Sequence, residues 1–70
     1  MMFQQAALFR AGELIVKLHK EREVELKAFL KMNTADSLQE AKVLYAEMEA
    51  LSTAGMVVVE RLQQGLDNGR

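Results

Sequence analysis

The chain has 70 residues, with nine Lys and Arg against ten Asp and Glu, and it contains no cysteine, proline or tryptophan. A disulfide-stabilised fold is therefore excluded, and so is a structural zinc site, which takes about four Cys or His ligands where this chain has only His19. A domain below about 80 residues seldom gains more than about 3 to 5 kcal/mol from its own core. We therefore expect one small domain over residues 1–70 that gains further stability from association.

The first twenty residues contain short apolar segments at 6–9 and 14–16, and Arg10 and Glu13 separate them. A secretory signal peptide has its positive charge first and then an unbroken apolar region, which is a different order. No stretch approaches the roughly 20 apolar residues that cross a bilayer. The sequence therefore predicts a cytoplasmic protein without a membrane segment.

Residues that favour helix dominate the whole chain, and no proline interrupts them. The one cluster of turn-forming polar residues between two apolar-periodic segments lies at 33–37. Within it, Ser37 and Glu40 match a capping box, in which each side chain satisfies a free backbone N–H at a helix start. The chain should therefore turn here and begin a second helix close to Ser37.

These signals predict a first helix over about 4–32, a turn at 33–36 and a second helix over about 37–65, which ends near Gly65. Two helices joined by a short turn form an antiparallel hairpin. The predicted fold is all-α: a two-helix hairpin that associates with a partner or self-associates into a bundle.

The second helix carries apolar residues at three positions of each seven-residue repeat, a wide face that is typical of packed bundles. These residues are Leu38, Ala41, Leu44, Tyr45, Met48, Leu51, Val58, Val59, Leu62 and Leu66, with Gly55 among them. On the first helix the matching face consists of Leu8, Ala11, Ile15, Leu18, Leu26, Phe29 and Met32, interrupted by Arg22. A turn near residues 34–35 places Arg22 opposite Glu47. It also places Ala11 and Gly12 near Val58 and Val57, and Leu14 near Gly55.

More apolar residues are present than one face of each helix can hold. On the second helix a small-residue stripe recurs at spacings of three and four, and consists of Val43, Ala46, Ala50, Ala54 and Val57. Phe9 and Val16 lie off the main face of the first helix. A repeated spacing of small residues predicts a further helix packed closely against this one, although scattered apolar residues are also normal on protein surfaces.

His19 and Glu23 are spaced for a metal site or acid-base chemistry on one helix face. The chain offers no second histidine and no cysteine, and a two-helix unit has no cleft to exclude water. We therefore expect these side chains to form a solvated face, and we expect no catalytic residue, no cofactor and no metal.

A basic stripe on the first helix consists of Arg10, Lys17, Lys20, Lys27 and Lys31. Such a stripe is able to follow phosphates, which leaves an alternative function: a homodimeric four-helix-bundle regulator that binds RNA or DNA. The sequence pI of about 5.8 and the neighbouring glutamates make nucleic acid the less favoured partner.

Residues 43–59, VLYAEMEALSTAGMVVV, follow a turn and a long charged helix. This segment resembles the small E-component co-chaperones of the bacterial type III secretion needle subunit. The shared features are an aromatic residue early in the second helix, a Glu, Ala and Leu pattern, and an aliphatic run, here Tyr45, Glu47, Ala50, Leu51, Ala54 and residues 56–59.

The resemblance implies a cytoplasmic, non-enzymatic co-chaperone in a heteromeric complex. It would pair with a larger helical-repeat chaperone and keep the needle subunit soluble and monomeric before export. The residues predicted to bind the partner are Phe9, Val16, Val43, Ala46, Ala50, Ala54 and Val57.

Overall fold

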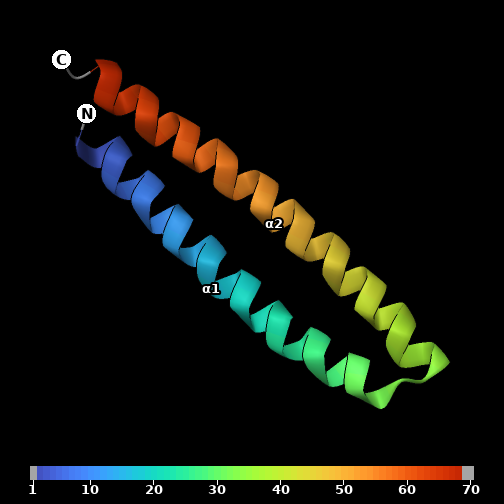
Figure 1. The fold of residues 1–70 in the computed structure, drawn as a ribbon. Coiled ribbons are helices and arrows are strands. Elements are labelled where there is room, and N and C mark those ends of the chain that lie inside the picture. Colours follow the sequence, from blue (N-terminus) through green and yellow to red (C-terminus); the bar gives the residue numbers. More distant parts are fainter. Residues whose placement is uncertain (1, 69–70) are drawn as a thin grey trace.

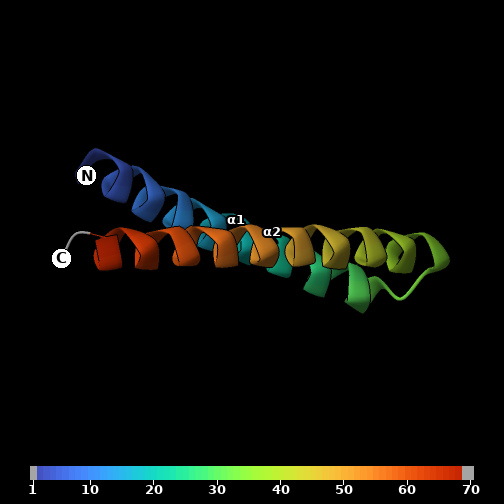
Figure 2. The same ribbon diagram turned by 90° about the horizontal axis from the view of Figure 1, so that it is seen from above.

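Two α-helices make up the structure, a computed structural model that describes residues 2–68 (Figure 1). Helix α1 spans Met2–Met32 and helix α2 spans Ala35–Asn68, with Asn33 and Thr34 between them. The helices pack side by side and antiparallel, so the turn lies at one end of the hairpin and both ends of the described chain lie at the other. Seen from above, α1 crosses α2 at a shallow angle (Figure 2). The predicted all-α, two-helix fold is confirmed.

The turn is fixed by hydrogen bonds at both helix ends. Asn33 has a φ of 50°, in the left-handed region that asparagine adopts more readily than most residues, and its N–H donates to the carbonyl of Phe29 at 3.4 Å. Oγ1 of Thr34 accepts from the N–H of Ser37 at 3.0 Å. In return, the N–H of Thr34 donates to Oγ of Ser37 at 2.8 Å. This reciprocal pair is a capping box that begins α2.

Both predicted ends of the second helix differ from the structure. The helix begins at Ala35 because Thr34 is the cap, and Ser37, which was predicted to be the cap, is its buried third residue. The helix continues beyond Gly65 to Asn68. A glycine ends a helix by adopting positive φ, and none of the glycines in the described chain does so.

The two helices meet along a seam with alternating spacings of four and three residues, as in coiled-coil packing. On α2 the buried and half-buried positions are Ser37, Ala41, Leu44, Met48, Leu51, Gly55, Val58, Leu62 and Gly65. Residues that recur every seven positions form a column along a helix. The prediction that the hairpin buries three such columns of α2 is wrong, because the third column, which contains Tyr45 and Val59, is exposed. Met32 of α1 is exposed as well. A single neighbouring helix covers two positions of each seven-residue repeat. A third position is buried only when a second helix packs against the same helix.

The predicted register holds at the middle of the hairpin, where Nε of Arg22 donates to Oε2 of Glu47 at 3.0 Å. At the open end Gly12 faces Val58, one residue from the predicted Val57. Gly55, however, faces Ile15 instead of Leu14. Successive helix residues point about 100° apart, so when Ile15 faces the seam Leu14 turns to the side and is exposed.

The buried core lies close to the turn. Leu26, Ala41 and Leu44 are each no more than 6% exposed, with Phe29 and Met48 packed against them. Toward the open end, over residues 4–16 and 52–67, every side chain is half-buried or exposed. The hairpin measures 54 × 14 × 11 Å and has a radius of gyration of 16.1 Å. A compact domain of this length would have a radius of gyration of about 11 Å, so the molecule is a rod with a core at one end.

Candidate functional site

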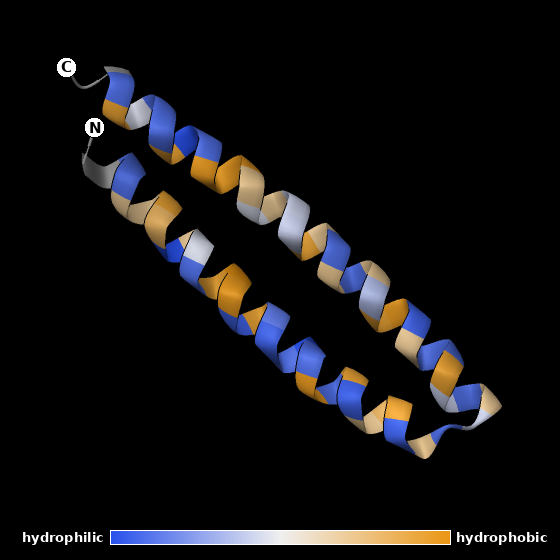
Figure 3. Cartoon of the chain, in the orientation of Figure 1, coloured by the Kyte–Doolittle hydropathy of each residue, from blue (hydrophilic) through white to orange (hydrophobic). Residues whose placement is uncertain are grey.

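Most of the large apolar side chains are exposed. Among the described residues, thirteen of them are at least 40% exposed, whereas three apolar residues are buried. Figure 3 shows apolar positions recurring along the whole length of both helices. The accessible surface is 5801 Å², against about 4,400 Å² for a compact monomer of 7.9 kDa. The larger total area follows from the rod shape of the hairpin, and the large apolar side chains exposed on it make it a candidate interaction surface.

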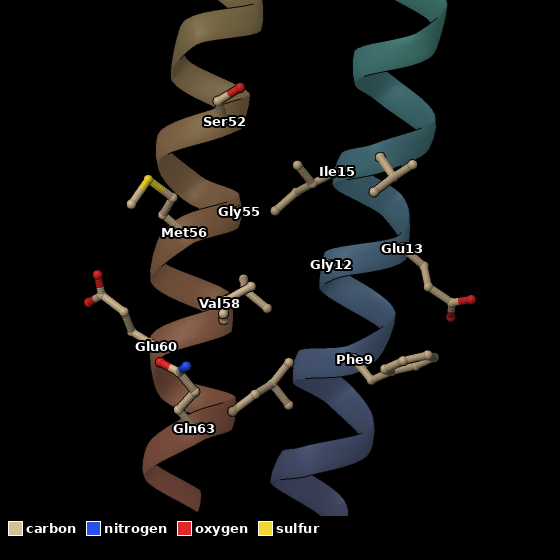
Figure 4. Close-up of a pocket in the computed structure, with 13 residues that line it drawn as sticks. Phe9, Gly12, Glu13, Ile15, Ser52, Gly55, Met56, Val58, Glu60 and Gln63 are labelled. Atoms are coloured by element: carbon tan, nitrogen blue, oxygen red, sulfur yellow. The ribbon is translucent and has the colours of Figure 1, made fainter.

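An open groove of about 770 Å³ lies between the helices near the open end (Figure 4). Ile15 and Val58 point into the space between the helices, where Gly12 and Gly55 lie on facing sides. The groove walls are apolar on both helices, and are formed by Phe9 and Val16 of α1 and by Met56 and Val59 of α2. Its polar lining residues are Glu13, Ser52, Glu60 and Gln63. Apolar walls with a polar rim resemble the centre of a protein interface.

A second, smaller groove continues on the same side toward the turn and shares Val16 and Ser52 with the first. Because the seam follows a seven-residue repeat, residues seven apart stay on the same side of the hairpin. Starting from Phe9 and Val59, this spacing extends the apolar surface along both helices. We call this surface the groove face; its exposed large apolar residues are Phe9, Val16, Leu30, Leu38, Tyr45, Met56, Val59 and Leu66.

Near the open end, the opposite side of the hairpin is more polar than the groove face. A groove of about 480 Å³ there is lined by Gln4, Ala7, Leu8, Arg61, Gln64 and Gly65. Residues seven apart lie on the same side, and Ala54 precedes Arg61 by seven residues, as Val57 precedes Gln64. Ala54 and Val57 of the small-residue stripe therefore lie on this side of the hairpin. The two sides therefore differ in chemistry: one presents large apolar side chains along its length with charged and polar residues among them, and the other mixes small apolar residues with amides and a guanidinium.

All seven residues predicted to bind a partner are exposed, but they do not form one surface. Phe9 and Val16 line the groove, whereas none of the five residues of the small-residue stripe lines the groove or its continuation. Val57 and Val59 are two residues apart and so point about 200° apart on α2. The prediction that these seven residues contact a partner remains untested.

The residues predicted to bind a partner leave out several groove-face residues, including Leu38, Tyr45, Met56 and Val59. Leu38, Tyr45 and Val59 are predicted to lie on the packed face of the hairpin. They recur every seven residues, as the seam residues do, so spacing alone does not distinguish them from the seam. The signal that identifies them is the third apolar column itself, since two helices have room to bury only two columns each.

The glycines at the open end are not required by a close approach of the helices. A Cβ at Gly12 would lie 3.6 Å from Cγ1 of Val58, and one at Gly55 would lie 3.6 Å from Cγ2 of Ile15. Both distances are ordinary van der Waals contacts, so alanine fits at either position. At Gly65 a Cβ would collide with the side chain of Gln5, which is long and able to move. The small residues therefore leave the open end loosely packed.

The charged side chains form pairs at the surface. Nζ of Lys27 lies 3.5 Å from Oε1 of Glu23, one turn earlier on α1. All five residues of the basic stripe are exposed, and Lys20 lies beside Glu23 in the smaller groove. His19 lines the same groove and is half-buried. Within residues 2–68, no three His, Cys, Asp or Glu side chains are grouped so that they could hold a metal ion.

No family model matches the chain, and neither a curated protein nor a solved structure matches it significantly. Over the described residues, neither helix has a stretch that is both long and apolar enough to cross a membrane.

Proposed function

We propose that this protein is a non-enzymatic interaction protein whose hairpin binds a larger partner. The observation that carries the proposal is that thirteen large apolar side chains of the described chain are at least 40% exposed, whereas two, those of Leu26 and Leu44, are buried and the rest are half-buried. Most of the free energy that stabilises a fold comes from apolar burial. A hairpin with this imbalance gains stability when a partner covers it, which is the behaviour of a subunit of a complex.

For the partner, we propose a helical-repeat chaperone, together with which the protein keeps a type III secretion needle subunit soluble and monomeric before export. The support is the resemblance of residues 43–59 to the E-component co-chaperones and the hairpin form that the resemblance implies. Such a role places the protein in the cytoplasm. A hairpin also suits this role physically, since it can pack on the end of a helical-repeat array and cover its apolar edge.

The small-residue stripe is the proposed contact for the chaperone. Val43 and Val57 are both more than 40% exposed, and the alanines between them allow a partner helix to approach closely. An arginine at Ala50 would place a long charged side chain in the middle of this contact.

The test is purification of the tagged, full-length protein from its native host, followed by mass spectrometry. The expected result is recovery of a helical-repeat chaperone and a needle-like subunit. Recovery should be lost with Ala50→Arg and retained with Ala28→Arg, a matched change of an exposed alanine on α1. Recovery of nucleic acid alone, or equal recovery with both variants, would contradict the proposal.

A further inference from the structure

We propose that the groove face is a self-association surface, on which a second copy of this chain packs to form a four-helix bundle. The proposal concerns a different surface from the small-residue stripe and does not depend on the co-chaperone role. It assigns eight of the thirteen exposed large apolar residues to the second copy, and it leaves Val43 and Val57 of the stripe to the larger partner.

The first argument is the number of apolar columns. Each helix of a four-helix bundle has two neighbours and buries about three positions per seven-residue repeat, whereas a helix in a hairpin has one neighbour and buries two. On α2 the seam uses two columns, and the third column contains Leu38, Tyr45, Val59 and Leu66, with the small polar Ser52 in the middle. On α1 the equivalent column contains Phe9, Val16 and Leu30, with Glu23 between the last two, where Lys27 pairs with it. The third columns of α1 and α2 both lie on the groove face. The two helices of a second copy, packed on this face, would therefore cover both columns.

The second argument is the area available for burial. A compact protein of twice this mass would expose about 7,300 Å², whereas each separate hairpin exposes 5801 Å². A compact dimer would therefore bury about 4,300 Å² in total, within the range of about 2,000 to 5,000 Å² that is typical of obligate homodimers. The area that one further copy would have to cover is therefore of the size that stable homodimers bury.

The third argument is the match in length and charge. The apolar residues of the groove face extend from Phe9 at the open end to Leu30 near the turn, and a partner must present an equally long apolar surface. A second copy of the hairpin is also 54 Å long and presents the same apolar surface along the same length. The four charged groups along this side of α1 are balanced, with Glu13 and Glu23 against Lys20 and Lys27. The charges on this side of α1 therefore cancel, and Glu60 of α2 adds one negative charge to the groove lining of each copy.

The test is sedimentation equilibrium of the full-length chain and of two matched variants, Val59→Glu and Val57→Glu. Both residues are exposed valines on α2, two positions apart, and the changes alter charge and helix propensity equally. Wild type is expected to be a dimer. Val59→Glu buries an unpaired carboxylate in each copy and should raise the dissociation constant by about 100-fold or more, whereas Val57→Glu should stay within about 3-fold of wild type.

A monomeric wild type at concentrations up to about 200 µM would overturn the proposal, because an interface of this size is expected to form well below that concentration. An equal effect of both variants, or a larger effect of Val57→Glu, would overturn it too. Assembly of wild type beyond a dimer would show that another surface associates, and would also contradict the proposal.

A second measurement covers the case in which Val59→Glu fails to fold. The chain has no cysteine, so Val59→Cys and Val57→Cys each introduce a single thiol with little change in size. The rate of alkylation at residue 59 should fall by about 10-fold or more between low and high protein concentration, because association buries the thiol. The rate at residue 57 should not change. Equal rates at residue 59 across the concentration range would overturn the proposal.

Discussion

The turn end of the hairpin buries Leu26, Ala41 and Leu44 and caps α2 with two reciprocal hydrogen bonds, whereas the open end holds three glycines in its seam and an apolar groove. The same two helices thus form a small complete core at one end and a loosely packed layer at the other. The turn end therefore contributes most of the buried core, and the open end is the part that the proposed association would complete. Each prediction below changes one part of the hairpin, and the expected changes in stability decrease from one to the next.

Truncating the core should separate the two ends most clearly. Leu44→Ala removes a side chain that is 6% exposed and should lower the free energy of unfolding by about 2 to 3 kcal/mol. Leu62→Ala removes a half-buried leucine from the seam at the open end and should lower the free energy of unfolding by about 1 kcal/mol. Urea denaturation followed by circular dichroism measures both at equal protein concentration. Equal losses would show that the two ends contribute alike.

Removing the cap should destabilise the turn end by less. Thr34→Ala deletes the oxygen that accepts from the N–H of Ser37 and should cost about 1 kcal/mol. The control is Thr53→Ala within α2, where the threonine hydroxyl donates to the carbonyl of Glu49 at 3.1 Å. This control should be neutral or stabilising, because alanine favours helix more than threonine does. A loss at residue 53 as large as that at residue 34 would contradict the assignment of the cap.

Filling the open end should stabilise the hairpin. Gly55→Ala adds a methyl group at contact distance from Ile15 and raises the helix propensity, so the free energy of unfolding should increase by about 0.5 to 1 kcal/mol. Gly65→Ala should gain less, because the side chain of Gln5 must move. A lower midpoint of urea denaturation for Gly55→Ala would show that the helices approach more closely at this point than the structure shows.

The ion pair between Arg22 and Glu47 should have the smallest effect. The two side chains are 32% and 45% exposed, and exposed ion pairs contribute about 0.2 to 1 kcal/mol. A double-mutant cycle with Arg22→Gln and Glu47→Gln should give a coupling energy in that range, which falls as salt is added. A coupling energy that salt does not change would indicate an environment more buried than the one observed.

The fold was predictable from the sequence because helix propensity, the absence of proline and the seven-residue repeat all indicate the same hairpin. The position of the turn and the pairing of Arg22 with Glu47 followed from these features. The start of α2 was misplaced because the capping box has Ser37 at its third position, where glutamate or glutamine is usual. Its end was misplaced because Gly65 marks a stop only when its φ is positive.

The candidate surface was only partly predictable. Phe9 and Val16 could be identified from their position away from the main face of α1, and the structure places them in the groove. Val59 could not be separated from Val58 by pattern, because both recur with seven-residue spacing along apolar columns. Only the crossing of the two helices decides that Val58 enters the seam and that Val59 remains exposed. Periodicity therefore gives the number of apolar columns, and packing decides which of them stays free.

The central claim is that covering the groove face completes the stability of the hairpin. Thermal denaturation of the wild-type chain, followed by circular dichroism at about 5 µM and about 200 µM, tests it directly, because association raises Tm with concentration. The account predicts a Tm that rises by several degrees for wild type and for Val57→Glu, and a lower, constant Tm for Val59→Glu. A wild-type Tm that is high and the same at both concentrations would contradict it.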